Sequence, residues 1–453
     1  MREPSEKEIF ETLPVHRAVA ALAVPTIISQ IVSIVYNLAD TFFIGRMGDP
    51  HMVAAVTLAA PWFNLLTALG NLFGIGGGSL ASRLLGAKRE DEVKYISSFC
   101  FYGGMAATGL FALFSFCGRG PLLRFLGAGP ENYDFAEVYF LWVVVLGGVP
   151  TMLSLTLGHL LRSEGHARQA SLGMMLGGVL NMLLDPLLMF GLSLGFAGAG
   201  IATACSNLVS CLFFLWCFGR LRGETALSLS AKAFRLRFAG QVFSVGLASA
   251  LTTGLENIAN MTIVKLASGY GDIAVAAYGV VKRVDLLPLG INMGLCQGFM
   301  PLVSYNYAAK DYRRMREISY FSWKTALIIG VSFVAAFLAF APWIVMSFIP
   351  EEQTILLGTS FLRIACLATP LMSVNALIIY TLQAMGKGLQ SSFLTLCRQG
   401  ALNVPLLILM NHAFGLYGMI WTQLTVELLM LPVTFGMYRA TSRKLKKDEE
   451  ISR

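Results

Sequence analysis

The sequence predicts an all-α integral membrane protein in which twelve transmembrane helices form two pseudo-symmetric six-helix bundles around a central cleft. Three observations predict this class: the composition, the length of the apolar runs and an internal repeat. Of the 453 residues, 56% are hydrophobic and only 13% are charged, whereas about a quarter of a soluble domain is charged. Apolar runs of at least 18 residues recur along the chain, and such runs are long enough to cross a bilayer as helices. A soluble enzyme, a secreted disulfide-rich scaffold and a nucleic-acid-binding protein are therefore excluded.

The individual helices follow from the apolar runs between charged residues, glycines and prolines. In the first half we expect spans over 16–44, 52–82, 95–117, 135–161, 168–191 and 195–219. In the second half we expect spans over 238–267, 272–305, 318–349, 354–385, 389–412 and 416–438. The polar N-terminus lacks a short apolar stretch with a cleavage site, so we expect no signal peptide to be removed.

The distribution of basic residues tests this number of spans. An even number puts both termini on one side, and that side then receives 26 of the 34 Lys and Arg residues. Three (Arg46, Arg119 and Arg124) fall on the other side and five fall within spans. Because basic residues gather on cytoplasmic loops, we expect a protein of the cell membrane with both termini in the cytoplasm.

The chain repeats itself at an offset of about 220 residues. Matching pairs are Asn37 and Asn260, Gly165 and Gly386, Pro186 and Pro405, and Gly195 and Gly415. We therefore expect an N-terminal bundle over 1–219, a basic cytoplasmic linker over 220–237, and a C-terminal bundle with a basic cytoplasmic tail over 238–453. Two like halves with the same orientation make a cleft between them, and by analogy of architecture such a cleft indicates transport by alternating access.

Polar residues within the first span form one stripe. Ser33, Asn37 and Asp40 recur at three- and four-residue spacing, with Tyr36 beside them. Pro25 precedes the stripe and removes a backbone hydrogen bond, which predicts a bend or hinge. Asp40 lies close to the end of its span, so a second interpretation is that it only caps the helix.

A second polar group is expected nearby. Asn181 and Asp185 are four residues apart on one helix face, and Thr203 lies at a similar depth in the next span. Charged groups at the bilayer centre are expensive and are usually functional. Two acids, an amide and a hydroxyl predict a site for a proton or a small cation, because hard cations prefer oxygen ligands. The alternative is that Asp185 merely bonds to the backbone.

The second half does not copy these acids, since Asp40 corresponds to Ile263 and Asp185 to Val404. It has its own acid, Glu256, one turn before Asn260. Glu256 can neutralise a cationic substrate, carry a second proton or pair with Lys282, and the sequence leaves these open. We expect Arg398 to tie spans together rather than to bind an anion. The glycine run over 74–78 lacks the lysine of a phosphate loop and predicts close helix packing, and the eight cysteines are expected to be free thiols.

These features together resemble one family, the multidrug and toxic compound extrusion (MATE) transporters. The stretches that carry the resemblance are Val24 to Gly45, Gly74 to Lys88, Leu161 to Gly165 and Asn181 to Pro186. The resemblance implies export of organic cations or drugs in exchange for H⁺ or Na⁺. It implies a coupling-ion site at Asp40, Asn181, Asp185 and Thr203, a hinge at Pro25, and a substrate cleft lined by Tyr36 and Asn37, to which Glu256 and Asn260 are added from the second half.

The sequence departs from the family pattern at two positions. Ala248 stands where many relatives have a proline in the seventh span, so the second bundle is expected to lack the matching bend. Gly158 stands where many have an asparagine, and His159 is the candidate substitute.

The resemblance implies no catalytic residue, no cofactor and no resident metal, although Na⁺ is possible at the coupling-ion site. The expected partners are small organic cations, H⁺ or Na⁺ and membrane lipid, with no nucleic acid and a monomeric state. One alternative is a flippase for a lipid-linked oligosaccharide, which would need a basic cavity. An intramembrane aspartyl protease using Asp40 and Asp185 is disfavoured because neither lies in a Gly-x-Gly-Asp sequence.

Overall fold

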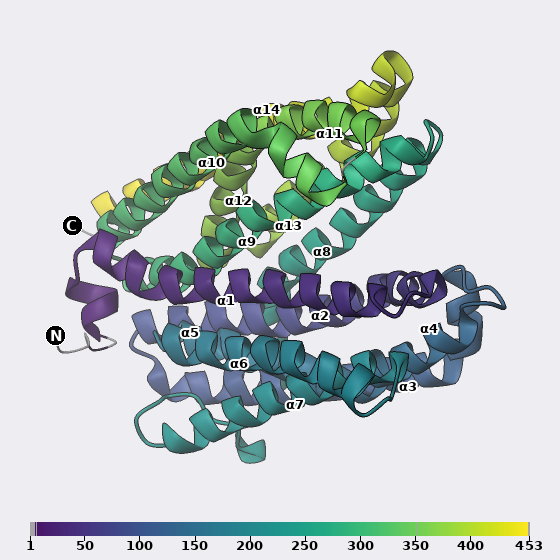
Figure 1. Ribbon diagram of the computed structural model, residues 1–453. Coiled ribbons are helices and arrows are strands. Elements are labelled where there is room, and N and C mark those ends of the chain that lie inside the picture. The colour runs from purple at the N-terminus through teal and green to yellow at the C-terminus, as the bar shows by residue number, and fades with distance from the viewer. Residues whose placement is uncertain (1–4, 6, 350, 452–453) are drawn as a thin grey trace.

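The chain folds into two groups of long helices that lie against each other (Figure 1). The computed structural model describes Ser5, residues 7–349 and residues 351–451, and within these residues it contains no β-strand. The first group comprises α1 (Val15–Gly45), α2 (Pro50–Gly86), α3 (Glu90–Phe125), α4 (Tyr133–Phe140), α5 (Gly148–Ser163), α6 (Ala167–Pro186) and α7 (Phe196–Arg220). The second comprises α8 (Ala239–Ser268), α9 (Asp272–Ala308), α10 (Tyr312–Phe348), α11 (Glu352–Ala365), α12 (Thr369–Ala384), α13 (Gly388–Thr395) and α14 (Asn403–Ile451). We call these groups the N half and the C half.

Short irregular turns join several of these helices into single membrane spans. In the N half, η2 (Leu141–Leu146) joins α4 to α5, and η3 (Leu187–Gly191) extends α6. In the C half, η6 (Cys366–Ala368) joins α11 to α12, and η7 (Leu396–Leu402) joins α13 to α14. These are tightened or widened helical turns, in which the backbone changes pitch without leaving the helix.

Twelve membrane spans result, as the sequence predicts. Ten helical stretches of the described chain are long and apolar enough to cross a membrane, and the pair α4 and α5, bent by 45°, is an eleventh. The longest stretch, Gly388–Leu445, has 58 residues, far more than a bilayer requires. It is interrupted at Gly415, whose φ of 61° and ψ of −146° are not helical, so it supplies two spans. The all-helical, twelve-span fold class is confirmed.

The same backbone turns recur in both halves. Four pairs of residues with positive φ lie 220 to 223 residues apart: Gly48 and Gly271, Lys88 and Lys310, Gly165 and Gly386, and Gly195 and Gly415. Positive φ is rare outside glycine. Its occurrence at both Lys88 and Lys310 (φ of 57° and 60°) therefore supports a structural repeat. The internal repeat detected in the sequence is thus a repeat of the breaks between helices.

The two halves contact each other most closely near the end of the molecule that carries both termini. There α1 packs against α9 and α2 against α8, and glycines allow the backbones to approach. A Cβ atom on Gly298 would lie 2.4 Å from the Cα of Ala23, and one on Gly76 would lie 2.3 Å from the carbonyl oxygen of Val242. The expected packing role of the 74–78 glycine run is confirmed. Toward the opposite end the two groups of helices diverge (Figure 1).

The segment that precedes α1 is bound to the C half. Its helical turn η1 (Glu8–Thr12) is held by Arg314 of α10, whose guanidinium donates hydrogen bonds of 2.9, 3.3 and 2.7 Å to the carbonyls of Phe10, Ile9 and Leu13. Phe10 also stacks on Tyr305, with ring centroids 4.8 Å apart. The N-terminal segment therefore bridges the halves at their closed end.

The linker between the halves lies along α3 of the N half. Ser98 donates hydrogen bonds of 2.9 Å to the carbonyls of Ser228 and Ser230, and the Tyr102 hydroxyl donates to the carbonyl of Leu229. Two single turns, η4 (Ala231–Ala233) and η5 (Leu236–Phe238), then lead into α8. The linker is anchored to one half before the chain enters the other.

Candidate functional site

The polar residues predicted in the N half do come together. Asp40 extends from α1, Asn181 and Asp185 from α6, and Thr203 from α7. The Asn181 amide donates a 3.4 Å hydrogen bond to the Thr203 hydroxyl. The carboxylates of Asp40 and Asp185 are close enough to interact electrostatically. We call these four residues the N-half acid site.

The acid site is short of hydrogen-bond donors. Asp185 is 0% exposed, and neither of its carboxylate oxygens has a hydrogen-bond partner within the described structure. The same is true of one oxygen of Asp40 and of the Asn181 amide oxygen. A buried carboxylate without donors is expensive in a medium of low dielectric constant. These oxygens are therefore suited to hold a proton or a small cation.

The structural alternatives for these acids are not supported. Asp40 lies five residues before Gly45, the last residue of α1, so it does not cap the helix. Asp185 lies at the end of α6 but makes no hydrogen bond to the backbone. Among the described residues, no three His, Cys, Asp or Glu side chains gather in a way that could hold a metal ion, and the acid site contains only two such side chains, Asp40 and Asp185.

Tyr139 of α4 is a neighbour of the acid site that sequence reasoning missed. It is 8% exposed and interacts electrostatically with Asp40, Asp185 and Tyr36. The sequence holds 14 tyrosines, and nothing in the spacing of Tyr139 distinguishes it. Its position depends on how α4 is rotated against α1 and α6, which a single sequence does not reveal.

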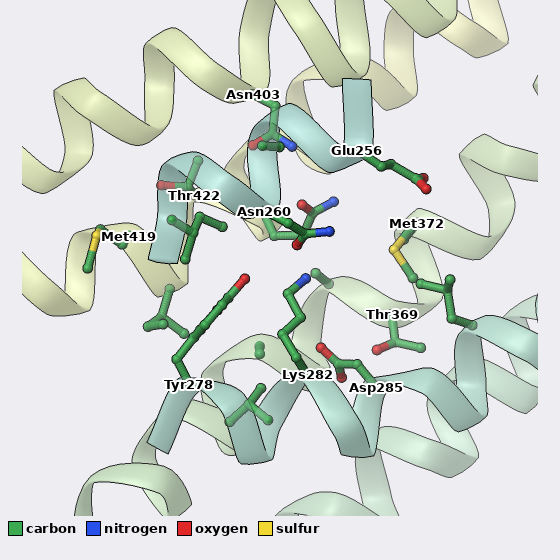
Figure 2. A pocket seen from close by; sticks show the side chains of 18 of the residues that line it. Glu256, Asn260, Tyr278, Lys282, Asp285, Thr369, Met372, Asn403, Met419 and Thr422 are labelled. Carbon is green, nitrogen blue, oxygen red and sulfur yellow. The ribbon is translucent and has the colours of Figure 1, made fainter. Parts of the chain in front are cut away.

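A cavity beside two of the expected substrate residues, Glu256 and Asn260, lies in the C half (Figure 2). It has about 1150 Å³ of empty space, including its open mouth, and is lined by Glu256 and Asn260 of α8 together with residues of α9, η6, α12, η7 and α14. Glu256 accepts a 3.0 Å hydrogen bond from Gln399, which in turn accepts one from Asn403. A second hollow of about 720 Å³ shares Glu256 and Gln399 and reaches Asn71 of α2. Glu256 thus lies between the C-half cavity and the boundary of the two halves.

The opposite wall of the cavity carries a cation. Figure 2 shows Tyr278 and Lys282 of α9 pointing toward Asn260, with Asp285 below Lys282. Lys282 interacts electrostatically with Asp285 and with Glu256, and its ammonium nitrogen lies 5.6 Å from the Tyr278 ring centroid. The cavity therefore contains two acids and one base, with a mixed rather than a basic lining.

Arg398 is compensated within the protein, as expected. Its guanidinium donates to both carboxylate oxygens of Glu427 on α14, the shortest distance being 2.7 Å, and the two side chains are 7% and 0% exposed. Glu427 also accepts hydrogen bonds from Asn375 at 2.8 Å and Gln423 at 2.7 Å. Arg398 therefore ties η7 to α14.

The remaining predicted residues lie on α1. Tyr36 packs against α6, where a Cβ on Gly178 would be 2.9 Å from its ring, and it also interacts with Asp40. Asn37 is exposed, and its amide donates to the Ser33 carbonyl at 2.7 Å. Neither lines the C-half cavity, which contains Glu256 and Asn260. Pro25 lies inside α1, which continues through it, whereas α8 has no proline at Ala248.

Several lesser expectations are also settled. All eight cysteines are free thiols. His159 is buried and packs against α2, where a Cβ on Gly74 would lie 2.7 Å from its ring. It is therefore a packed core residue at the closed end of the N half, near Arg162.

Two like groups of membrane-spanning helices, a pair of neighbouring acids in one and a polar cavity in the other define a class, the membrane transporters built from two repeated bundles. Known proteins identify the family. The sequence profile of the MatE family matches residues 25–187 and 248–409, one segment in each half.

Individual proteins agree with this match. The multidrug export protein MepA of Staphylococcus saprophyticus is 33% identical over 418 residues, which cover 92% of each chain. MepA of Staphylococcus aureus is 32% identical over 423 residues, 93% of this chain and 92% of that one. A crystal structure of MATE in the straight conformation superposes with a TM-score of 0.92 at 24% identity, over 98% of this chain and all of the other. The chain belongs to the MatE family of transporters.

Proposed function

We propose that this protein exports organic cations or drugs from the cell in exchange for H⁺ or Na⁺. The single observation that carries the proposal is the N-half acid site, where Asp185 is fully buried and both of its carboxylate oxygens lack partners. Such a site gains most from binding a proton or a small cation, because nothing else compensates the charge. Export of drugs is supported by the resemblance to MepA proteins, which are named as multidrug export proteins.

In this proposal the coupling ion binds at Asp40, Asn181, Asp185 and Thr203. Asp40 belongs to α1, and α1 packs directly against α9 of the C half. Neutralising Asp40 therefore changes the helix that forms the boundary between the halves, and Pro25 is the position at which α1 bends in response. The exchange requires that ion and substrate favour different states of the boundary.

The substrate is proposed to occupy the C-half cavity, beside Glu256 and Asn260 of α8. Tyr36 and Asn37 of α1, which were expected to border the substrate, lie outside this cavity. Glu256 supplies the negative charge that an organic cation needs, and the apolar residues around it suit flat hydrophobic molecules. Two methionines in the described cavity walls, Met372 and Met419, can adapt to ligands of different shape.

The flippase alternative has less support. An anionic lipid-linked sugar needs uncompensated positive charge in the cavity, but Arg398 is saturated by Glu427, and Lys282 faces Asp285 and Glu256. The proposed direction is export, because an inward flow of H⁺ or Na⁺ drives the exchanged substrate outward.

The test is a substrate-driven collapse of a preset pH gradient in everted membrane vesicles, measured with and without Na⁺. We expect added cationic dye to collapse the gradient in sodium-free buffer for the wild type and not for Asp185→Asn. Glu224→Gln, which removes an exposed acid, is the matched control and should behave as wild type. No response to any cationic dye with either ion would refute drug antiport and favour the flippase.

A further inference from the structure

An arginine-lined hollow lies between α10 and α14, away from both the acid site and the C-half cavity. It has about 890 Å³ of empty space, including its open mouth. Its lining contains Arg313 and Arg316 from α10 and Arg439 and Arg443 from α14. Among the described residues of the lining, Glu317 is the one acid, and it pairs with Arg313 at 3.1 Å. Four guanidinium groups thus line one hollow, and that of Arg313 is paired with Glu317.

The hollow lies at the level where the helices leave the membrane. On α10, Tyr320 is 48% exposed and the exposed apolar residues begin at Leu327. On α14, the exposed apolar residues end at Val433 and Arg439 follows. Exposed tyrosines beside basic residues are typical of the headgroup region. In Figure 1 these ends of α10 and α14 lie at the end of the molecule that carries the termini.

The internal repeat allows the arginine cluster of the C half to be compared with the matching positions of the N half. The comparison tests whether the cluster is more than the general excess of basic residues on one side of the membrane. The offset of 222 that relates Lys88 to Lys310 places Asp91 and Lys94 opposite Arg313 and Arg316. The offset of 220 that relates Gly195 to Gly415 places two glycines, Gly219 and Gly223, opposite Arg439 and Arg443. The matching place in the N half therefore has one base and one acid, and the arginine cluster is particular to the C half.

We propose that this hollow binds the phosphate headgroup of an anionic phospholipid. Guanidinium groups donate paired hydrogen bonds that match phosphate oxygens, and basic pockets at the membrane surface favour acidic lipids. The ring of Tyr438 closes the floor of the hollow, because it is 1% exposed and packs edge-on against Trp323 at 4.7 Å. The headgroup lies in the hollow while the acyl chains follow the exposed apolar surface of α10. This site is separate from the proposed transport activity.

The experiment is a titration of the detergent-purified full chain with phosphatidylglycerol, with bound lipid counted by native mass spectrometry. We expect saturable binding to the wild type and roughly thirty-fold weaker binding to Arg439→Gln/Arg443→Gln, because two phosphate-facing charges are lost. Both arginines are exposed, so the variant should fold, and its melting temperature verifies this. The control is Arg222→Gln/Lys232→Gln, which removes two exposed charges from the linker and should bind as the wild type does.

Competition identifies the source of the phosphate. Phosphatidylcholine and inorganic phosphate should both compete poorly with phosphatidylglycerol. Equal loss of binding in the linker variant would overturn the proposal by showing that surface charge alone attracts the lipid. Inorganic phosphate that displaces the lipid at similar concentration would overturn it in favour of a soluble anion, and the absence of saturable lipid binding would also refute it.

Discussion

The buried ion pair between Arg398 and Glu427 allows a quantitative prediction about what holds the C half together. Replacing Arg398 with Met removes a planar cation from a position that is 7% exposed and leaves a carboxylate that is 0% exposed. Replacing Glu427 with Gln keeps the shape of the side chain and removes only its charge. The two variants should therefore lower the free energy of unfolding by different amounts.

The difference follows from the hydrogen bonds that remain. Without Arg398, one oxygen of Glu427 still accepts from Gln423 at 2.7 Å and the other from Asn375 at 2.8 Å. Breaking a buried pair costs about 3–5 kcal/mol, and this partial compensation places Arg398→Met near the lower end, about 3 kcal/mol. In Glu427→Gln, the donors Arg398, Asn375 and Gln423 face an amide that has one acceptor oxygen and one donor nitrogen. The buried arginine also keeps its charge. We therefore expect about 5 kcal/mol for Glu427→Gln.

Equilibrium unfolding in mixed micelles, followed by circular dichroism, measures these free energies. Arg363→Met removes an exposed arginine from α11 and should change the free energy of unfolding by less than about 0.5 kcal/mol. The double variant Arg398→Met/Glu427→Gln should cost about 2–3 kcal/mol less than the sum of its single variants, as expected for side chains in direct contact. Additive costs, or an Arg398→Met penalty no larger than the Arg363→Met change, would refute the reasoning.

Three further predictions concern other parts of the molecule. Asp185→Asn should abolish ion-coupled efflux without lowering the melting temperature, because its carboxylate makes no hydrogen bond that the amide could lose; a large loss of stability would show that the acid is structural. Gly76→Ala should lower the free energy of unfolding by about 2 kcal/mol, because the added Cβ would lie 2.3 Å from the Val242 carbonyl oxygen. Gly279→Ala, whose added Cβ would meet open space, should leave the stability unchanged. Thermal unfolding compares the two variants. Arg314→Ala removes three hydrogen bonds to the N-terminal segment, so limited proteolysis of that segment should become at least several-fold faster, and an unchanged rate would show that the segment is held by other contacts.

The fold was predictable because its main determinants are properties of single segments of the sequence. The length of an apolar run decides whether it can span the membrane, and the basic residues decide how many spans there are. Boundaries agree to within a few residues where a turn ends the helix, as for the span expected over 195–219 and found as Phe196–Arg220. They fail at the last helix, expected to end at 438 and found to continue to Ile451. Its tail is rich in Lys, Arg and Glu, which are good helix formers but carry no apolar signal.

The candidate site was predictable only in part, because it depends on how helices face one another. Asp40 and Asp185 were identifiable since an acid in an apolar run needs a reason to be there. Tyr139 carries no such signal in the sequence. Arg398 and Glu427 are 29 residues apart and lie on different helical elements, so their pairing depends on helix rotation. Tyr36 likewise lies with the acid site, because α6 covers that side of α1.

The comparison of the two halves explains where chemistry can reside in a repeated fold. The breaks between helices recur, as the paired positive φ values at Gly195 and Gly415 demonstrate, because both halves must turn the chain in the same way. The buried polar residues do not recur: Asp185 corresponds to Val404 in the C half. In the N half both carboxylate oxygens of the buried Asp185 lack hydrogen-bond partners within the described structure, whereas in the C half Glu427 is saturated with donors. A carboxylate whose oxygens all accept hydrogen bonds stabilises one structure. A carboxylate whose oxygens lack partners makes the free energy of the structure depend on whether a proton or a cation binds to it. We therefore infer that conformational change is driven from the N half, with the C half acting as the more rigid wall against which α1 and α2 repack.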